Sequence, residues 1–213
     1  MDSYNYTEFS TGDYDFDNFE GPVVGSKAPD FQLTTSDGKG IRLLDFDGEL
    51  LVLEMGSITC PLFQGRRAGM EALSQDARVS ARVLYIREAH SGADIQGHAN
   101  FEDKQACASR LNGDDRETRT ILVDDPRGRS SWTILVDDFE GTAHRAYGGM
   151  PNSVFVINRN GCVVFRSAWN NASATAQAVA SLLSGKAVTT KSYSWPVPPT
   201  VVLQTLRRGG KGS

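Results

Sequence analysis

The sequence predicts an α/β fold with a central mixed sheet, helices on both faces and an N-terminal β-hairpin. In the middle of the chain, apolar runs alternate with helical segments, which favours a core of parallel strands. Near the start, the turn signal Ser36-Asp37-Gly38-Lys39-Gly40 separates two short apolar segments. Near the end, Asn158-Arg159-Asn160-Gly161 joins two more, so a closing hairpin adds antiparallel strands to the parallel core.

The elements of the first half follow from their patterns in order. The opening hairpin pairs residues 31–34 with residues 41–43. Residues 50–55 are mostly apolar and predict a buried strand, and residues 64–73 predict the helix after it. Residues 82–86 predict the next strand.

The second half begins with a capped helix and contains a short repeat. Residues 100–111 predict a helix that Asn100 caps and a following Asn-Gly pair ends. The segment Thr-Ile-Leu-Val-Asp-Asp occurs at 120–125 and again at 133–138, which indicates a local duplication and not a solenoid. We expect the second copy to lie in the sheet, because residues 139–147 then supply the helix that must follow. The remaining elements are two strands and an alanine-rich helix, at 153–157, 163–166 and 172–183.

Composition divides the chain into a domain, residues 25–185, between two tails. Residues 1–24 hold six acidic side chains and no Lys or Arg, which is typical of an acidic, disordered tail. Six aromatic side chains in the same segment suggest an alternative, docking on a partner or on the domain itself. Their spacing fits neither a strand nor a helix, so we expect disorder. Residues 186–213 form a Pro- and Gly-containing C-terminal tail.

Bulk properties exclude several classes of protein. A net charge of -4 and a pI near 5.4 argue against nucleic-acid partners. The apolar runs are shorter than the roughly 20 residues of a membrane span, and the acidic N-terminus does not resemble a signal peptide. Three widely spaced cysteines, Cys60, Cys107 and Cys162, do not form a disulfide framework. We therefore expect a cytoplasmic protein.

The segment Gly56-Ser57-Ile58-Thr59-Cys60-Pro61-Leu62-Phe63 is the strongest chemical signal in the chain. It places Cys60 where a strand turns into a helix, and Pro61 suits the first helical position. Unpaired N–H groups and the helix dipole favour an anion there, so we expect a thiol pKa below the ordinary value of about 8.5. Cys60 is therefore the predicted nucleophile, and a buried, inert cysteine is the alternative.

Other polar side chains are expected to gather around Cys60. The Ser57 and Thr59 hydroxyls would bond the thiolate or a substrate anion, or would simply cap the helix. His90 and Glu88 follow the neighbouring strand, where His90 would deliver a proton and Glu88 would orient it or contact substrate; a solvated loop is the alternative. His98 and His144 have weaker claims, and the histidine spacing predicts no metal site.

Two further features concern the substrate and the recycling of Cys60. Met150-Pro151 precedes a strand; a cis Pro151 would free the Met150 backbone to pair with substrate, whereas a trans proline is the ordinary alternative. Cys107 and Cys162 could resolve an oxidised Cys60, although Cys107 is expected to be packed in its helix and Cys162 to be remote. No Cys-x-x-Cys motif is present at Cys60, because Phe63 occupies its last position.

Together these segments resemble the iodothyronine deiodinase family. The resemblance rests on the Gly56–Phe63 segment, on Tyr85-Ile86-Arg87-Glu88-Ala89-His90 and on the strand led by Pro151, and it covers about residues 25–183. It implies a thioredoxin fold with peroxiredoxin-like features, with Cys60 at the position of the family's catalytic selenocysteine. It also implies that Glu88 and His90 move protons or bind substrate, with Ser57 in the relay. We expect Thr59, Phe63, Met150 and Pro151 to lie near the substrate.

Three functions remain as hypotheses. The first is a deiodinase-like thiol oxidoreductase, whose Cys60 thiolate attacks iodine on an aromatic compound and is reset by an external thiol. Such an enzyme needs no cofactor or metal, only a thioredoxin- or glutathione-type donor, and it is compatible with a homodimer. The second is a peroxiredoxin-like peroxidase, although the usual Pro-x-x-x-Thr-x-x-Cys loop is missing, with Leu53 and Ser57 in its place. The third is a non-enzymatic redox-sensing or binding module.

Overall fold

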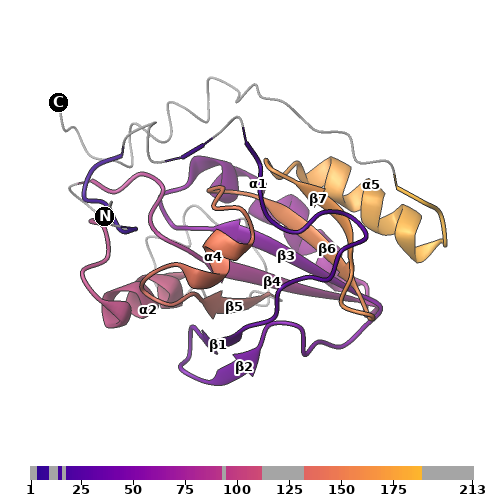
Figure 1. The fold of residues 1–213 in the computed structure, drawn as a ribbon, viewed down its shortest axis with the longest axis horizontal. Coiled ribbons are helices and arrows are strands. Elements are labelled where there is room, and N and C mark those ends of the chain that lie inside the picture. Colours follow the sequence, from indigo (N-terminus) through magenta and orange to yellow (C-terminus); the bar gives the residue numbers. More distant parts are fainter. Residues whose placement is uncertain (1–3, 10–13, 16–17, 93–94, 112–131, 189–213) are drawn as a thin grey trace.

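A mixed seven-stranded sheet organises the chain. The computed structural model describes residues 4–9, 14–15, 18–92, 95–111 and 132–188. The strand order is β2-β1-β5-β4-β3-β6-β7 (Figure 1). The strands are β1 (Gln32–Thr35), β2 (Gly40–Arg42), β3 (Leu50–Gly56), β4 (Val79–Tyr85), β5 (Thr133–Val136), β6 (Val154–Asn158) and β7 (Val163–Ser167).

The parallel and antiparallel parts of the sheet lie where the sequence predicts them. Strands β3, β4 and β5 are parallel neighbours, while β1, β2, β6 and β7 pair antiparallel at the two sides. The second copy of the Thr-Ile-Leu-Val repeat forms β5, which confirms the expected placement. The first copy, residues 120–125, lies outside the described residues.

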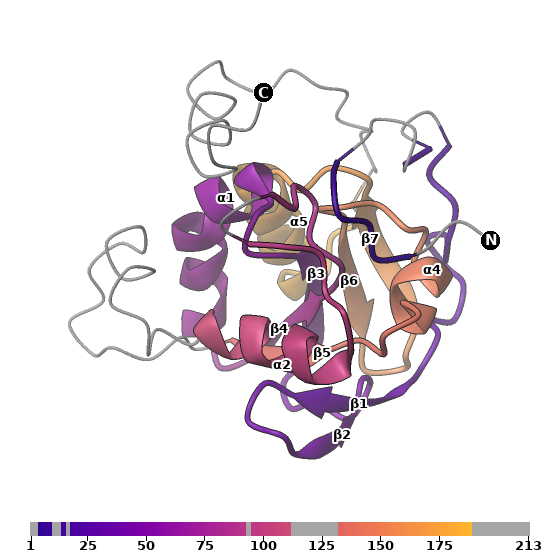
Figure 2. The same ribbon diagram turned by 90° about the vertical axis from the view of Figure 1, so that its left-hand side faces the viewer.

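Helices cover both faces of the sheet, as expected. They are α1 (Pro61–Glu71), the 3-10 helix η2 (Ala72–Gln75), α2 (Phe101–Arg110), α4 (Thr142–Ala146) and α5 (Ala172–Leu183). One apolar cluster packs α1, α2 and α5 against Val52 and Val83, and a second packs α4 against Leu53 and Leu84 on the other face. In Figure 2, α1 and α4 lie on opposite sides of the strands. None of the helices in the described part of the chain is long and apolar enough to cross a membrane.

The predicted helix at 139–147 is shorter in the structure. It begins at Thr142 because Gly141 adopts a left-handed conformation with φ of 72°. The Asp137 carboxylate satisfies the first turn, accepting hydrogen bonds from the Ala143 and His144 N–H groups at 3.1 and 2.9 Å. Asn100 caps α2 as predicted, accepting from the Asp103 N–H at 2.8 Å.

The described residues of the segment 1–24 pack on the domain, which corrects the expectation of a disordered tail for them. Tyr4 and Tyr14 are buried. The Tyr4 hydroxyl lies 2.7 Å from His144 Nδ1, and the Arg87 guanidinium lies 5.1 and 4.4 Å from the centres of the Tyr4 and Tyr14 rings. The aromatic spacing fits no regular element because these rings occupy separate sites around one cation.

Candidate active site

The candidate site lies where β3 and β4 end. The two strands are parallel and in register, with Gly56 beside Tyr85, so the loops that follow them run side by side. The Ala89 N–H donates to Ser57 Oγ at 3.1 Å, and the His90 N–H donates to Thr59 Oγ1 at 3.0 Å. The predicted meeting of the two motifs at the carboxyl edge of the sheet is therefore correct.

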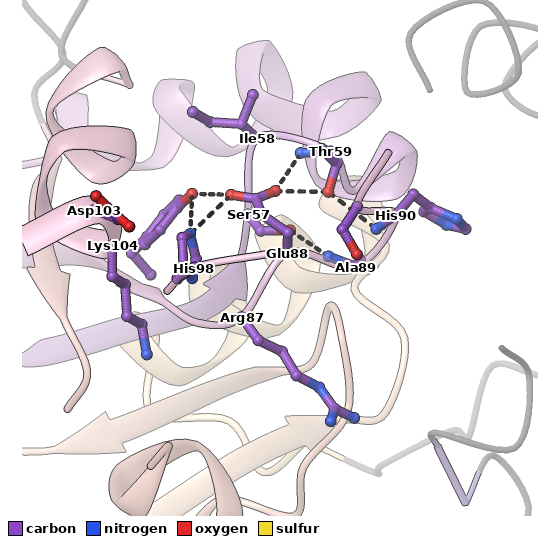
Figure 3. Close-up of polar contacts among 12 residues, drawn as sticks. Ser57, Ile58, Thr59, Arg87, Glu88, Ala89, His90, His98, Asp103 and Lys104 are labelled. Atoms are coloured by element: carbon purple, nitrogen blue, oxygen red, sulfur yellow. Dashed lines mark hydrogen bonds and ion pairs between the residues drawn. The ribbon is translucent and has the colours of Figure 1, made fainter. Parts of the chain in front are cut away.

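The Glu88 carboxylate is the centre of this site (Figure 3). Its side chain is fully buried, and Oε2 accepts hydrogen bonds from the Thr59 N–H at 2.9 Å and from Thr59 Oγ1 at 2.6 Å. Oε1 accepts from the Tyr85 hydroxyl and lies 3.5 Å from His98 Nε2. Glu88 thus links the residue before Cys60 to a buried imidazole.

The imidazole beside Glu88 belongs to His98, and not to His90, which the sequence ranked first. The His98 imidazole faces Glu88, is 1% exposed and lies 3.4 Å from the Tyr85 hydroxyl; its Nδ1 has no hydrogen-bond partner among the described residues. The sequence around His98 contains no motif that would predict its contact with Glu88, because the described residues between the two form no helix or strand. Tyr85 carried a usable signal, since a tyrosine at the end of a buried strand needs a partner for its hydroxyl.

His90 lies beside the site, with its imidazole pointing away from Glu88 (Figure 3). The ring packs against Phe9, with 4.3 Å between the ring centres. Burial lowers the pKa of His90, and the nearby Glu88 charge opposes that shift. Glu88 therefore does not orient His90 as the sequence suggested.

The environment of Cys60 differs most from expectation. Cys60 is the N-cap of α1, and N–H groups of Leu62 and Phe63 favour its thiolate, as predicted from the helix start. The side chain is nevertheless buried, and this desolvation raises the pKa of Cys60 to about 12, with a smaller raising contribution from Glu54. The predicted pKa below 8.5 is therefore wrong, because the loss of water has a larger effect on the pKa than the helix terminus has.

An N-terminal strap, residues 4–9 and 14–15, lies across the site. The Tyr6 hydroxyl donates to the Ala89 carbonyl at 2.8 Å and lies 3.0 Å from the Tyr14 hydroxyl. Ser91 Oγ donates to the Tyr6 carbonyl at 2.9 Å. Tyr14 is buried near enough to Cys60 for the thiolate charge to raise the pKa of Tyr14, an effect that adds to burial.

Replacing Tyr14 by Ala should expose Cys60. Loss of the buried ring weakens the strap, so we expect iodoacetamide to alkylate Cys60 at least about tenfold faster at pH 9. Peptide mass spectrometry separates Cys60 from the other two cysteines. Phe19→Ala is the matched control, because Phe19 packs on Phe155 at the opposite face of the sheet. Equal rates in wild type and Tyr14→Ala would show that the strap does not cover the thiol.

Three of the predicted site residues make their contacts within the fold itself. Ser57 is buried and holds the backbone of Ala89, so it does not cap α1. Phe63 is 1% exposed and packs over Gly56. The Met150–Pro151 peptide bond is trans, and the Met150 carbonyl lies 2.9 Å from His144 Nε2. The trans alternative for Pro151 is therefore the one observed, and the Met150 carbonyl already has a partner.

The other cysteines occupy different ends of the domain. Cys162 is in the β6–β7 hairpin, beside the start of β3, whereas Cys60 follows the end of β3. Cys107 is half-buried on α2, and ligand atoms of Cys107, Glu88 and His98 lie within 4.8 Å of one another. This trio is a chemically suitable set for a borderline metal such as zinc. In the structure, Glu88 already uses both oxygens in hydrogen bonds.

Comparison with known proteins identifies the family of the chain. A family model described as iodothyronine deiodinase matches residues 4–183. None of the curated proteins compared with the chain matches it.

Solved structures show the fold. An uncharacterized conserved protein from Geobacillus kaustophilus is 18% identical, with a TM-score of 0.59 over 80% of this chain and 87% of that one. A hypothetical protein from Sinorhizobium meliloti is 20% identical, with a TM-score of 0.57 over 81% and 91%. A putative thiol:disulfide interchange protein from Chlorobium tepidum is 18% identical, with a TM-score of 0.52 over 76% and 99%. The fold is thioredoxin-like.

Proposed function

Because the chain belongs to the iodothyronine deiodinase family, we propose that it removes iodine reductively from an iodinated aromatic compound, with Cys60 as the nucleophile. Family and fold together support a function of thiol-oxidoreductase type. The observation that carries the finer proposal is the buried Glu88 carboxylate, which joins Thr59, next to Cys60, to His98. A nucleophile beside a proton-conducting chain is what reductive dehalogenation of an aromatic ring requires.

The first step consumes one proton. The Cys60 thiolate attacks iodine, a sulfur–iodine bond forms, and the carbon–iodine electron pair passes to the ring carbon. That carbon takes a proton, so that Cys60–S⁻ + Ar–I + H⁺ gives Cys60–S–I + Ar–H. We assign delivery of the proton to Glu88, which would be replenished by His98 and Tyr85 through their contacts with the carboxylate.

Two external thiols complete the cycle. The first, R–SH, displaces iodide and a proton to leave Cys60–S–S–R, and the second releases R–S–S–R and restores the Cys60 thiol. A thioredoxin- or glutathione-type donor in a reducing compartment such as the cytoplasm suits this step. The sequence offers no resolving Cys-x-x-Cys partner, and Cys162 lies at the wrong end of β3.

We expect substrate to displace part of the N-terminal strap, because the Cys60 side chain is buried and Tyr14 of the strap lies near it. Phe9 and His90 lie at the edge of this cover, with an aromatic contact between them. An iodinated ring would take the place of an aromatic ring of the strap, and His90 would then contact substrate instead of conducting the proton. Aromatic rings replace one another well because their packing geometries are similar.

The direct test is iodide release from a panel of iodinated phenols with dithiothreitol as reductant. We expect release by the wild-type protein, release at background by Cys60→Ser, and wild-type release by the control Cys162→Ser. Hydrogen peroxide is the competing substrate for the same samples. Iodide release that survives Cys60→Ser contradicts the proposal, as does rapid peroxide-driven oxidation of Cys60 without iodide release from any phenol, which would favour a peroxidase.

A further inference from the structure

A half-buried cysteine, Cys107, lies next to the Glu88–His98 pair, and the proposed mechanism does not use it. Cys107 is on α2, whereas Glu88 and His98 belong to the segment between β4 and α2. One ligand atom from each of these three side chains lies within 4.8 Å of the other two. Among the residues that the structure describes, this is the one group of three His, Cys, Asp or Glu side chains placed so closely. The fold thus brings together a carboxylate, an imidazole and a thiol, the side-chain types that bind zinc.

The spacing of the ligand atoms is close to that of a zinc site. Zinc binds nitrogen and oxygen at about 2.0–2.2 Å and sulfur at about 2.3 Å in a tetrahedron, so neighbouring ligand atoms lie roughly 3.3–3.6 Å apart. His98 Nε2 and Glu88 Oε1, which face each other in Figure 3, are already 3.5 Å apart. The Cys107 sulfur, within 4.8 Å of the other two ligand atoms, has to move by no more than about 1.5 Å to reach such a separation.

The hydrogen bonds present at the cluster leave room for a metal. Glu88 Oε1 accepts from the Tyr85 hydroxyl, but a carboxylate oxygen has two lone pairs, so one remains on the side of His98. The contacts of His98 Nε2 with Tyr85 and Glu88 are long, at 3.4 and 3.5 Å, and His98 Nδ1 has no hydrogen-bond partner among the described residues. A metal between Nε2 and Oε1 therefore displaces no short hydrogen bond of the imidazole.

The charge and softness of the three ligands select the kind of metal. A thiolate and a carboxylate together neutralise a divalent cation, which suits a site whose Glu88 and His98 side chains are 0% and 1% exposed. Thiolate and imidazole favour zinc over magnesium or calcium, which prefer oxygen ligands. Because Cys107 is only half-buried, its side of the cluster offers an entry path and a place for water as the fourth ligand.

We propose that Glu88, His98 and Cys107 bind one Zn²⁺ ion, which reversibly blocks proton delivery to the reacting ring. Binding follows Cys107–SH + Zn²⁺ → Cys107–S–Zn⁺ + H⁺, with no change of oxidation state. The ion occupies Glu88 Oε1 and His98 Nε2, the two facing atoms through which the proton would pass. Inhibition rests on the proposed function, whereas zinc binding does not.

Metal affinity and the cobalt spectrum test the binding site. Reduced protein freed of small thiols should bind one zinc ion per chain in competition with a chromophoric chelator. With Co²⁺ as the probe, it should show a thiolate-to-cobalt charge-transfer band. Cys107→Ser should lose this band and bind zinc more than about 100-fold more weakly, since loss of an outer partner alone costs 10- to 100-fold. The matched controls Cys60→Ser and Cys162→Ser should keep both. A cobalt band that survives Cys107→Ser, or disappears in Cys60→Ser, overturns the proposal.

A measurement on the wild type guards against a folding defect in Cys107→Ser. One equivalent of zinc should slow the alkylation of Cys107 by iodoacetamide at pH 8 at least about tenfold, because a metal-bound thiolate is no longer a free nucleophile. Alkylation of Cys162, followed by peptide mass spectrometry in the same sample, should not change. Equal rates for Cys107 with and without zinc contradict its role as a ligand.

Inhibition is tested by single-turnover formation of the deiodinated phenol, without dithiothreitol, which itself binds zinc. One equivalent of zinc should lower the wild-type rate at least about tenfold, and a chelator should restore it. In Cys107→Ser, the rates with and without zinc should agree within a factor of two. Full activity of the zinc-loaded wild type overturns the inhibition. Failure of the proposed deiodination would instead appear as no product even without zinc, with the measured zinc affinities unaffected.

Discussion

Replacing Glu88 by Gln should lower iodide release about 10²- to 10⁴-fold, the range typical for loss of a proton-transferring group. Gln occupies nearly the same volume but cannot carry the proton that the ring carbon needs. In the wild type, Thr59 and Tyr85 donate hydrogen bonds to the Glu88 carboxylate. The amide of the variant would turn its N–H₂ group, which cannot accept, toward one of these donors. The measurement is single-turnover iodide release at saturating substrate, with Cys60 alkylation recorded on the same samples.

The alkylation rate separates a proton-transfer role from a structural one. It should change only a few-fold in Glu88→Gln, because alkylation consumes no proton from the relay. Glu71→Gln is the control for loss of a carboxylate near α1 and should release iodide like the wild type. Tyr85→Phe and His98→Gln should give smaller losses, since each removes one link and leaves the carboxylate. A loss below tenfold in Glu88→Gln would exclude Glu88 as the proton donor.

Acid should destabilise the fold through His144 by about 5 kcal/mol in total. His144 is buried, with Nδ1 toward the Tyr4 hydroxyl and Nε2 toward the Met150 carbonyl, so the neutral imidazole has a donor and an acceptor. Burial lowers the pKa of His144 from 6.5 to about 3. The unfolded chain therefore binds a proton that the folded chain does not, and stability falls from pH 6.5 down to about 3.

Glu54 acts in the opposite direction over part of this range. Its pKa is raised from 4.5 to about 7, so the folded chain binds the extra proton between these values and gains about 3 kcal/mol as the pH falls. Urea unfolding of wild type and His144→Gln at pH 7, 5 and 4 gives the free energy of unfolding of each protein. The difference between their pH dependences is the contribution of His144. Parallel curves for the two proteins would mean that His144 is protonated in the folded state.

Local patterns predicted most of the regular structure. Strands β3 and β6 and helices α2 and α5 lie within a few residues of their predicted bounds, because apolar periodicity and caps act over one or two turns. The carboxyl-edge position of Cys60 and Glu88 followed from parallel strand order alone. Helix α4 was overextended, since the left-handed Gly141 that delays its start becomes visible only in the backbone conformation.

The details of the site depended on contacts between distant segments. The sequence did not predict that His98 contacts Glu88, because distance along the chain does not show which imidazole a loop brings back to that carboxylate. The pKa of Cys60 was predicted in the wrong direction because the helix terminus is a local feature, whereas the desolvation comes from the core that surrounds the side chain. The strap was expected to be disordered because its contacts leave no local pattern in the sequence. Its partners, Arg87 and His144, lie far from it along the chain.

By itself, the sequence determined the α/β class, the order of the elements, the family resemblance and the presence of a cysteine at a strand-to-helix junction. Only the tertiary structure decided which imidazole meets Glu88 and how deeply Cys60 is buried. The division has a physical cause. Backbone preferences and helix ends are properties of neighbouring residues, whereas desolvation and charge coupling depend on everything that the fold places around a group.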